Sequence, residues 1–330
     1  MGKQDFPFRG DGSKGDPRST MERAAEMFHF DETIKGSNLP PLDIPKELIP
    51  PAPKRKRKPK ASSAAPKGGE QPGMPTEDAP RAADWSGPVQ LLNREAMAEA
   101  GYLVPGSPIS AVSEEFRIVK RELLARIRGN RQHSAIPNGN VILVTSAHPG
   151  DGKTYCSVNL AVSLAAESDI EVLLVDADFA KPGIAQAFGL QPGKGLMDAL
   201  ADPSLAIEDM VIRTDVPSLC ILPAGESCHL DTEYLASART EALIASLVAG
   251  RPDRVVIFDS PPLLAASPAS VLAAHVGQTV LVVRADRTTE TSLRDAAGLL
   301  NGCANIQLLL NGVKFSASGR RFGTYYGREG

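Results

Sequence analysis

The stretch VILVTSAHPGDGKT, residues 141–154, decides how the rest of this chain is interpreted. A short apolar run is followed by a glycine-containing loop and then by Gly152, Lys153 and Thr154. This is the order in which a buried strand leads through a loop into a helix. The backbone N–H groups of such a loop and the positive end of the helix dipole together bind phosphate oxygens. We therefore expect a phosphate-binding loop, with Lys153 on the β- and γ-phosphates and the Thr154 hydroxyl on Mg²⁺.

The residues of this loop form the predicted nucleotide site. They are Pro149, Gly150, Asp151, Gly152, Lys153, Thr154 and Tyr155. The match to the strict phosphate-loop pattern is imperfect, because that pattern has Gly five residues before Gly152 and this chain has Ala147. A structural turn without a ligand is therefore the alternative, and the remainder of the chain decides between the two.

Three carboxylates follow strand-like runs further along the chain. The run VLLVDAD ends in Asp176 and Asp178, and the run VVIFDSPP contains Asp259. Continuous apolar runs are typical of parallel strands that are covered on both faces, and the carboxyl ends of such strands meet at one edge of the sheet. We expect Lys153 and the three aspartates to be catalytic, and Mg²⁺ to be held by Thr154, Asp259 and Asp176. Helix N-caps after each strand are the alternative.

Strand-like and helix-like segments alternate after residue 141. The further strand-like runs are 218–223, 279–283 and 307–310, and the helical patterns are 153–166, 239–248 and 288–300. Alternation at this spacing produces βαβ units. The sequence therefore predicts an α/β fold with a doubly wound, mostly parallel sheet of the P-loop NTPase kind, whose ligand lies at the carboxyl ends of the strands.

The composition narrows the class of protein. The net charge is −3, which argues against a nucleic-acid-binding protein. No apolar stretch approaches the length of a membrane span, and the N-terminus has no apolar signal-peptide region. We therefore expect a cytoplasmic protein that reaches a membrane only through a partner. The four Cys residues lack the paired spacing of a metal site and are expected to be buried thiols.

The chain is expected to divide near residue 105. Residues 1–105 are rich in Pro, Gly, Ser and Lys and predict a largely disordered extension. Within it, a capping box predicts a short helix near residues 19–30, which is either a docking helix or a transient one. The basic run at 54–60 is either a solvated linker or a contact for anionic lipid or nucleic acid. The two remaining parts are a catalytic domain, 106–316, and a flexible tail, 317–330.

Three segments, taken in order, resemble the motifs of the bacterial tyrosine kinases that control exopolysaccharide export: SAHPGDGKT, VLLVDADFAKP and FDSPPLL. Their fold is that of the division-site and plasmid-partition ATPases, and the resemblance covers about residues 110–315. It implies an enzyme that uses ATP and Mg²⁺ to phosphorylate its own tyrosines, with Asp176 orienting the tyrosine hydroxyl and accepting its proton, and Asp178 supporting it or the metal. It also implies that Asn311 recognises adenine, although a strand-end Asn equally caps a turn.

Two departures from the related patterns point in opposite directions. The partition ATPases carry an extra Lys early in the phosphate loop, and in this chain that place falls at or beside His148. This favours the kinase over the alternative function, which is a partition- or positioning-type ATPase switch without tyrosine transfer. The kinase motif, however, often has Arg two residues after its second Asp, where this chain has Ala180 followed by Lys181.

The segment SEEFRIVKR, from residue 113, resembles the helix through which these kinases assemble into a ring. Three-residue steps place Glu114, Arg117 and Lys120, or Arg121 in place of the last, on one helix face. These residues are therefore expected at the interface of a homo-oligomer. A surface helix with ordinary ion pairs is the alternative.

The end of the chain supplies the expected phosphate acceptors. Tyr325 and Tyr326 lie in a Gly-flanked segment, and the related kinases phosphorylate a C-terminal tyrosine cluster. An incidental Tyr pair in a disordered terminus is the alternative. The resemblance also implies a membrane chain-length regulator of polysaccharide assembly as a separate activator, and hence a location peripheral to the inner membrane. The Pro-rich N-terminus and the KRELL segment look like the kinases of exosortase-linked operons.

Overall fold

The computed structural model describes residues 85–130 and 134–313, all of which belong to one compact unit. The other residues lie outside the described part of the chain, and so do several of the predictions that concern them. These are the helix near 19–30, the basic run at 54–60, and the tail 317–330 with Tyr325 and Tyr326.

The described residues form one sheet in the strand order β1-β4-β5-β3-β6-β2-β7-β8. Its strands are β1 (Val89–Gln90), β2 (Val141–Ser146), β3 (Glu171–Asp176), β4 (Ile212–Thr214), β5 (Leu219–Leu222), β6 (Arg254–Asp259), β7 (Gln278–Arg284) and β8 (Ile306–Asn311). All neighbouring strands are parallel except β4 and β5, which are antiparallel. The mostly parallel sheet predicted from the sequence is confirmed.

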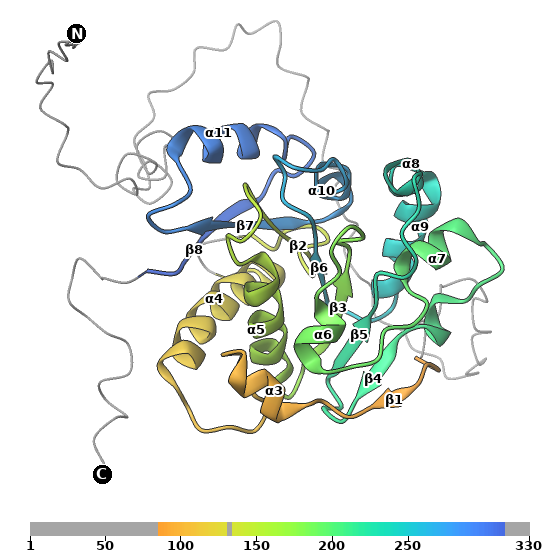
Figure 1. Ribbon diagram of the computed structural model, residues 1–330, viewed down its shortest axis with the longest axis horizontal. Helices are drawn as coiled ribbons and strands as arrows, with labels where there is room; N and C mark the ends of the chain where they lie inside the picture. Colours follow the sequence, from red (N-terminus) through yellow and green to blue (C-terminus); the bar gives the residue numbers. More distant parts are fainter. Residues whose placement is uncertain (1–84, 131–133, 314–330) are drawn as a thin grey trace, which may run out of the picture. The chain divides into compact units, whose positions relative to one another are not determined.

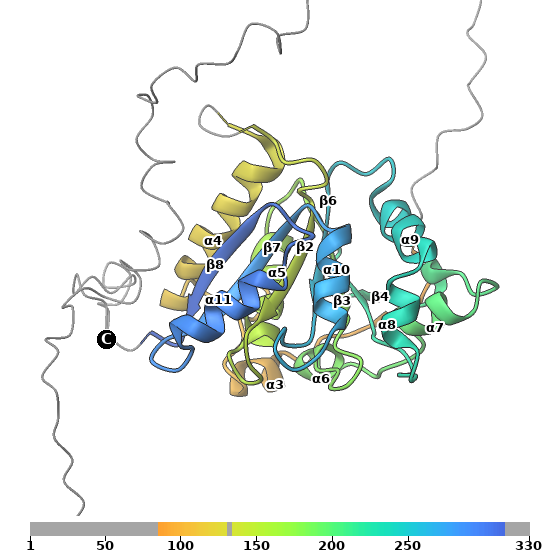
Figure 2. The ribbon, with the colours of Figure 1, turned by 90° about the horizontal axis from the view of Figure 1, so that it is seen from above.

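Helices cover both faces of this sheet. They are α3 (Arg94–Glu99), α4 (Ala111–Arg128), α5 (Lys153–Ala165), α6 (Ile184–Phe188), α7 (Leu196–Ala201), α8 (Asp231–Leu235), α9 (Ala238–Val248), α10 (Pro268–Leu272) and α11 (Glu290–Gly298), with short 3₁₀ turns η2 (Ile207–Asp209) and η3 (Ala273–His275). Figure 1 shows α4 and α5 on one side of the sheet and α10 and α11 on the other, and Figure 2 shows the same layers from above.

The core is therefore split by the sheet into two clusters. Val141 and Leu143 of β2 pack with α7 to α11, whereas Ile142 and Val144 of the same strand pack with α3 to α6. Side chains of a strand alternate between its two faces, so a strand covered on both sides must be apolar at every position. This explains why β2, β3 and β6 are continuous apolar runs in the sequence.

The folded domain begins earlier than residue 106, where the sequence pattern places its start. Residues 85–105 contain β1, which pairs with β4, and α3, which is capped by the Asn93 side chain accepting from the Ala96 N–H at 3.0 Å. The Asn93 N–H also donates to the Phe188 carbonyl of α6, at 2.9 Å. The prediction of an extension up to residue 105 is thus wrong for this segment, because its order comes from long-range contacts rather than from local periodicity.

Candidate active site

The phosphate loop connects β2 to α5, as its sequence predicts, and its shape requires two glycines. Gly150 and Gly152 adopt left-handed φ angles of 82° and 98°, which other L-residues rarely adopt. A Cβ on Gly152 would lie only 2.0 Å from Nδ2 of Asn311. That amide donates to the Asp151 carbonyl at 2.9 Å. Asn311, predicted to recognise adenine, thus holds the end of β8 directly against the loop.

Asp151 stabilises the loop from within. Its side chain is fully buried, and Oδ2 accepts a hydrogen bond from the His148 N–H at 3.0 Å. The carboxylate is therefore turned into the loop, so that this residue contributes its backbone to the predicted nucleotide site and its side chain to the shape of the loop.

Lys153 and Asp178 form an ion pair at the start of α5. The Lys153 Nζ lies 2.6 Å from Oδ2 of Asp178; the Asp178 side chain is buried and that of Lys153 is partly exposed to the cavity. The other oxygen of Asp178 accepts the Lys181 N–H at 3.2 Å. The pair joins two residues 25 positions apart, so the sequence could place them at the same edge of the sheet but could not show their contact.

Asp176 is enclosed by backbone donors. One carboxylate oxygen accepts the Asp178 N–H at 3.2 Å, and the other accepts the N–H groups of Gly183 and Ile184 at 2.9 and 3.0 Å. Burial raises the pKa of this carboxyl to about 6, although these hydrogen bonds oppose the rise. Because both oxygens accept these donors, Asp176 fixes the loop between β3 and α6.

Asp259 lies at the end of β6 with no exposed surface. Burial raises its pKa to about 7, against the opposing charge of Lys153 and the hydroxyls of Thr154 and Ser157; the nearby Asp176 adds to the rise. The Ser157 hydroxyl donates to Oδ1 at 2.9 Å, whereas Oδ2 has no hydrogen-bond partner among the described residues.

This buried oxygen fits a metal site. A carboxylate and a hydroxyl are hard oxygen donors, and Mg²⁺ in phosphoryl-transfer sites takes one or two protein ligands together with substrate phosphates and water. Asp259 and Thr154 supply that set. Within the described ranges, no three carboxylate, His or Cys side chains converge to hold a metal by themselves.

A cavity of about 860 Å³ opens over these groups. Its walls include Lys153, Thr154 and Asp178, together with Lys181 and the Pro261-Pro262 turn after β6. A volume of this size accommodates a nucleoside triphosphate. The cavity lies at the carboxyl ends of β2, β3 and β6, which is where ligands bind in open α/β sheets.

Tyr102 is a wall residue that the sequence analysis missed. Its ring stacks on Tyr155 of α5 with centroids 5.6 Å apart, and Tyr155 in turn meets the edge of Phe116 at 6.3 Å. Burial raises the pKa of both tyrosines. Tyr102 lies in the segment assigned to the extension, so no local signal connects it with the phosphate loop.

Comparisons with known proteins agree with this geometry. A family model described as "AAA domain" matches residues 139–311. Tyrosine-protein kinase YwqD of Bacillus subtilis is 31% identical over 240 residues, which cover 72% of this chain and 95% of that protein. This chain belongs to the bacterial tyrosine-protein kinase family. The resemblance inferred from the three motifs is confirmed.

Other members of this kinase family extend the comparison. A putative tyrosine-protein kinase EpsB of Ralstonia nicotianae is 34% identical over 213 residues, which cover 63% of this chain and 27% of that protein; the chain thus spans about a quarter of the relative. The solved kinase domain of Escherichia coli tyrosine kinase ETK superposes with a TM-score of 0.53 at 26% identity, covering 64% of this chain and 80% of that one. Within residues 85–130 and 134–313, every helix is too short or too polar to cross a membrane.

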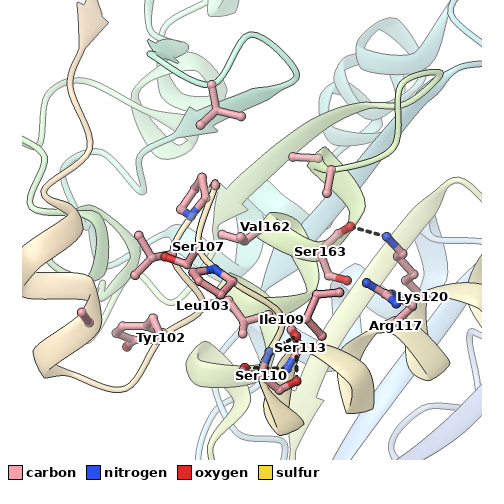
Figure 3. Close-up of a pocket in the computed structure, with 18 residues that line it drawn as sticks. Tyr102, Leu103, Ser107, Ile109, Ser110, Ser113, Arg117, Lys120, Val162 and Ser163 are labelled. Carbon is pink, nitrogen blue, oxygen red and sulfur yellow. Dashed lines mark hydrogen bonds between the residues drawn. The ribbon is translucent and has the colours of Figure 1, made fainter. Parts of the chain in front are cut away.

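The helix expected to form the kinase ring places its charged residues differently. Arg117 pairs with Glu114 at 2.7 Å, and Arg121 is exposed. Lys120, in contrast, is buried: its amine donates to the Ser163 carbonyl of α5 at 2.7 Å and pairs with Glu167 at 2.6 Å. Figure 3 shows this amine pointing toward Ser163 at the edge of a cavity of about 490 Å³.

Lys120 is therefore buried within the subunit, so that of the two alternatives for the last position of the expected interface, Lys120 and Arg121, it is Arg121 that is exposed. A step of three residues falls short of the roughly 3.6 residues of a full turn, so Lys120 is rotated from Arg117 toward α5, where a carbonyl and a carboxylate compensate its charge. Of the basic residues predicted for the ring interface, Arg117 and Arg121 remain accessible to a neighbouring subunit.

Proposed function

We propose that the chain is an ATP-dependent protein-tyrosine autokinase that transfers the γ-phosphate of ATP to Tyr325 and Tyr326. One observation carries the proposal: Lys153, Thr154 and Asp178 line a single cavity at the end of the phosphate loop, and the buried carboxylate of Asp259 lies next to Lys153 and Thr154. Phosphoryl transfer depends mainly on positioning and on neutralising charge, and this site offers a cation, a metal-binding carboxylate and a second carboxylate for the acceptor.

Different residues of the site are assigned to the nucleotide and to the metal. Backbone N–H groups of the segment from Gly150 to Thr154 bind the phosphates, apart from that of Asp151, which donates to the His148 carbonyl, and Lys153 binds the β- and γ-phosphates. Thr154 and the oxygen of Asp259 that lacks a partner among the described residues would hold Mg²⁺. When bound, the ion neutralises charge on the phosphate oxygens.

We assign the tyrosine hydroxyl to Asp178 in place of Asp176, to which the sequence analysis gave this role together with a place on the metal. Asp176 is enclosed by three backbone donors, whereas Asp178 faces the cavity and is held there by Lys153. Once Lys153 turns to the phosphates of ATP, Asp178 loses this partner and becomes an acceptor for the hydroxyl proton. The tyrosine has a reference pKa of about 10, so this proton leaves late in the transfer.

The cellular context follows from the sequence resemblance. We infer a ring-shaped homo-oligomer that uses Arg117 and Arg121, a separate membrane chain-length regulator as activator, and a role in exopolysaccharide chain length or export. The protein then lies in the cytoplasm at the inner membrane, held there by its partner. Each phosphotyrosine adds a charge of about −1.5 to −2, which repels neighbouring tails and loosens the ring.

The test is phosphosite mapping by mass spectrometry after incubation of the full chain with Mg-ATP, with and without the cytoplasmic tail of a membrane regulator. Phosphate on Tyr325 or Tyr326 that disappears in Lys153→Met, but not in the exposed control Lys194→Met, is the expected result. A Tyr325→Phe/Tyr326→Phe variant identifies the acceptors. Steady ATP hydrolysis without phosphotyrosine, even with the regulator present, would instead establish the partition-type ATPase switch.

A further inference from the structure

Two arginines lie beside the phosphate loop: Arg284, the last residue of β7, and Arg287, in the turn that leads to α11. A Cβ on Gly150 would lie 3.3 Å from Nη1 of Arg287, which places this guanidinium directly over the loop. The Arg284 guanidinium is packed against Gly312, since a Cβ there would lie 2.7 Å from its Cζ. Both side chains therefore border the backbone that forms the nucleotide site.

The turn that carries them is fixed by hydrogen bonds. The Arg284 N–H donates to the Thr288 hydroxyl at 2.9 Å, and the Arg287 N–H donates to the Arg284 carbonyl at 3.2 Å. The Ala285 N–H donates to the carbonyl of Asn311 at 2.9 Å, the same residue whose amide binds the phosphate loop. The arginines are thus held at a defined place relative to the loop.

The charge of this arginine pair is not compensated within the described ranges. Neither Arg284 nor Arg287 forms an ion pair with a carboxylate of residues 85–130 or 134–313. Arg284 is half-buried, where an uncompensated charge is costly, and Arg287 is exposed at the rim of the loop. Two guanidiniums in this setting favour an anion, because their planar donors match phosphate oxygens.

We propose that Arg287 binds the non-transferred phosphates of the nucleotide, with Arg284 adding positive charge behind it. Lys153, Asp178 and Asp259 surround the transfer side of the site, whereas Arg287 reaches the loop at Gly150 from the strand end that carries Asn311. The chain has no Lys between Val141 and Lys153, so the cations near the loop besides Lys153 are Lys181 of the cavity wall and Arg287 beside Gly150. The inference rests on the nucleotide site of the proposed function.

This placement has a kinetic consequence. The α- and β-phosphates are present in ATP and in ADP, so a contact with them stabilises the ground state and the transition state equally. Loss of Arg287 therefore weakens the binding of both nucleotides and leaves kcat unchanged. Loss of Lys153, in contrast, lowers kcat.

The test compares Arg287→Gln with Arg294→Gln in the full chain, since Arg294 is an exposed arginine of α11 outside the site. Isothermal titration gives Kd for Mg-ATP and Mg-ADP, and phosphotransfer at saturating ATP gives kcat. We expect Arg287→Gln to raise both Kd values about tenfold, the effect of one lost charge-assisted hydrogen bond, with kcat changed less than about twofold.

Unchanged Kd values for both nucleotides would overturn the inference, and so would weaker binding of ATP with unchanged binding of ADP. The second result would place Arg287 at the transferred phosphate. If the wild-type chain bound neither nucleotide, the proposed function itself would fail, which separates the two outcomes. The exposed position of Arg287 makes unfolding of the variant easy to exclude by circular dichroism.

Discussion

The two ends of the strand pair β3 and β6 differ in how their charges are compensated. The strands run parallel in a register that aligns Glu171 with Arg254 at the amino end and Asp176 with Asp259 at the carboxyl end. The amino end thus combines opposite charges, whereas the carboxyl end combines two carboxylates. Burial raises the pKa of both carboxylates, to about 6 for Asp176 and about 7 for Asp259.

The amino end is closed by the N-terminal segment. Arg254 is fully buried and lies 3.1 Å from the Glu171 carboxylate, which also pairs with Arg251. The Trp85 indole N–H donates to Glu171 at 2.7 Å, and its ring lies 4.1 Å from the Arg254 guanidinium carbon. The charges of the amino end are compensated within the protein, whereas one oxygen of Asp259 at the carboxyl end has no hydrogen-bond partner among the described residues, and we propose that it binds Mg²⁺.

The largest expected effect is at the carboxyl end. Asp259→Asn removes the carboxylate that we propose binds Mg²⁺, and we expect phosphotransfer to fall about a thousandfold, the scale of a lost charge-stabilising group. Stability should not fall, because the substitution removes a carboxylate whose ionised form is disfavoured by burial. The measurement pairs phosphotransfer rates with urea unfolding. The control is Asp253→Asn, which removes an exposed carboxylate just before β6. A similar loss of activity in this control would contradict the special role of the carboxyl end.

At the amino end of the strand pair we expect the opposite result, a loss of stability without a loss of nucleotide binding. Glu171→Ala removes the carboxylate that faces buried Arg254, which typically costs about 3–5 kcal/mol of unfolding free energy. The folded fraction should retain its nucleotide affinity. Glu122→Ala, which removes an exposed pair with Arg126, should cost less than about 1 kcal/mol. Equal destabilisation by the two variants, in urea titrations, would contradict the role assigned to the amino end.

The pH dependence of stability sharpens the same contrast. Asp176 and Asp259 have folded-state pKa values of about 6 and about 7, above the unfolded value of about 3.9. The folded state therefore holds protons that the unfolded state has released, so stability without metal falls as pH rises from about 4 to about 7. We expect a loss of about 2–4 kcal/mol between pH 5 and pH 8 in metal-free buffer. Asp259→Asn should flatten this profile; a wild-type profile that rises instead would show that both carboxylates are ionised at no cost.

The smallest expected effect on stability concerns Trp85, the residue that covers the ion pair at the amino end of the strands. Trp85→Phe keeps an aromatic ring over Arg254 but removes the N–H that donates to Glu171, and we expect a loss of about 1 kcal/mol. Trp85 is the only Trp of the chain, so circular dichroism rather than fluorescence should follow unfolding of the variant. A loss as large as that of Glu171→Ala would mean that the N-terminal segment, and not the ion pair, closes this end of the sheet.

The sequence predicted the elements that depend on local pattern. The helix expected at 153–166 is α5, Lys153–Ala165, and the strand run ending in Asp259 is β6. Periodicity reports which faces of a segment are buried, and a strand covered on both sides is apolar throughout. The same logic placed the three aspartates at the carboxyl edge of a parallel sheet.

The sequence could not predict segments whose order depends on distant partners. The strand β1 is two residues long and exists because it pairs with β4, more than a hundred residues later. The spacing of charged residues predicts Lys120 on the surface of its helix. In the folded chain its amine is buried, because it contacts the Ser163 carbonyl and the Glu167 carboxylate. Such contacts have no local signature, since the free energy that orders them comes from tertiary packing.

The sequence by itself determined the phosphate loop, the alternation of strands and helices, and the family to which the chain belongs, because short motifs and hydrophobic periodicity encode them. Only the tertiary structure decided what each charged group does. It showed that Asp176 is held by backbone donors while Asp178 faces the cavity with Lys153. It also brought Arg287 to Gly150. Hydrogen bonds and ion pairs act over a few ångströms, and the fold alone determines which residues come that close.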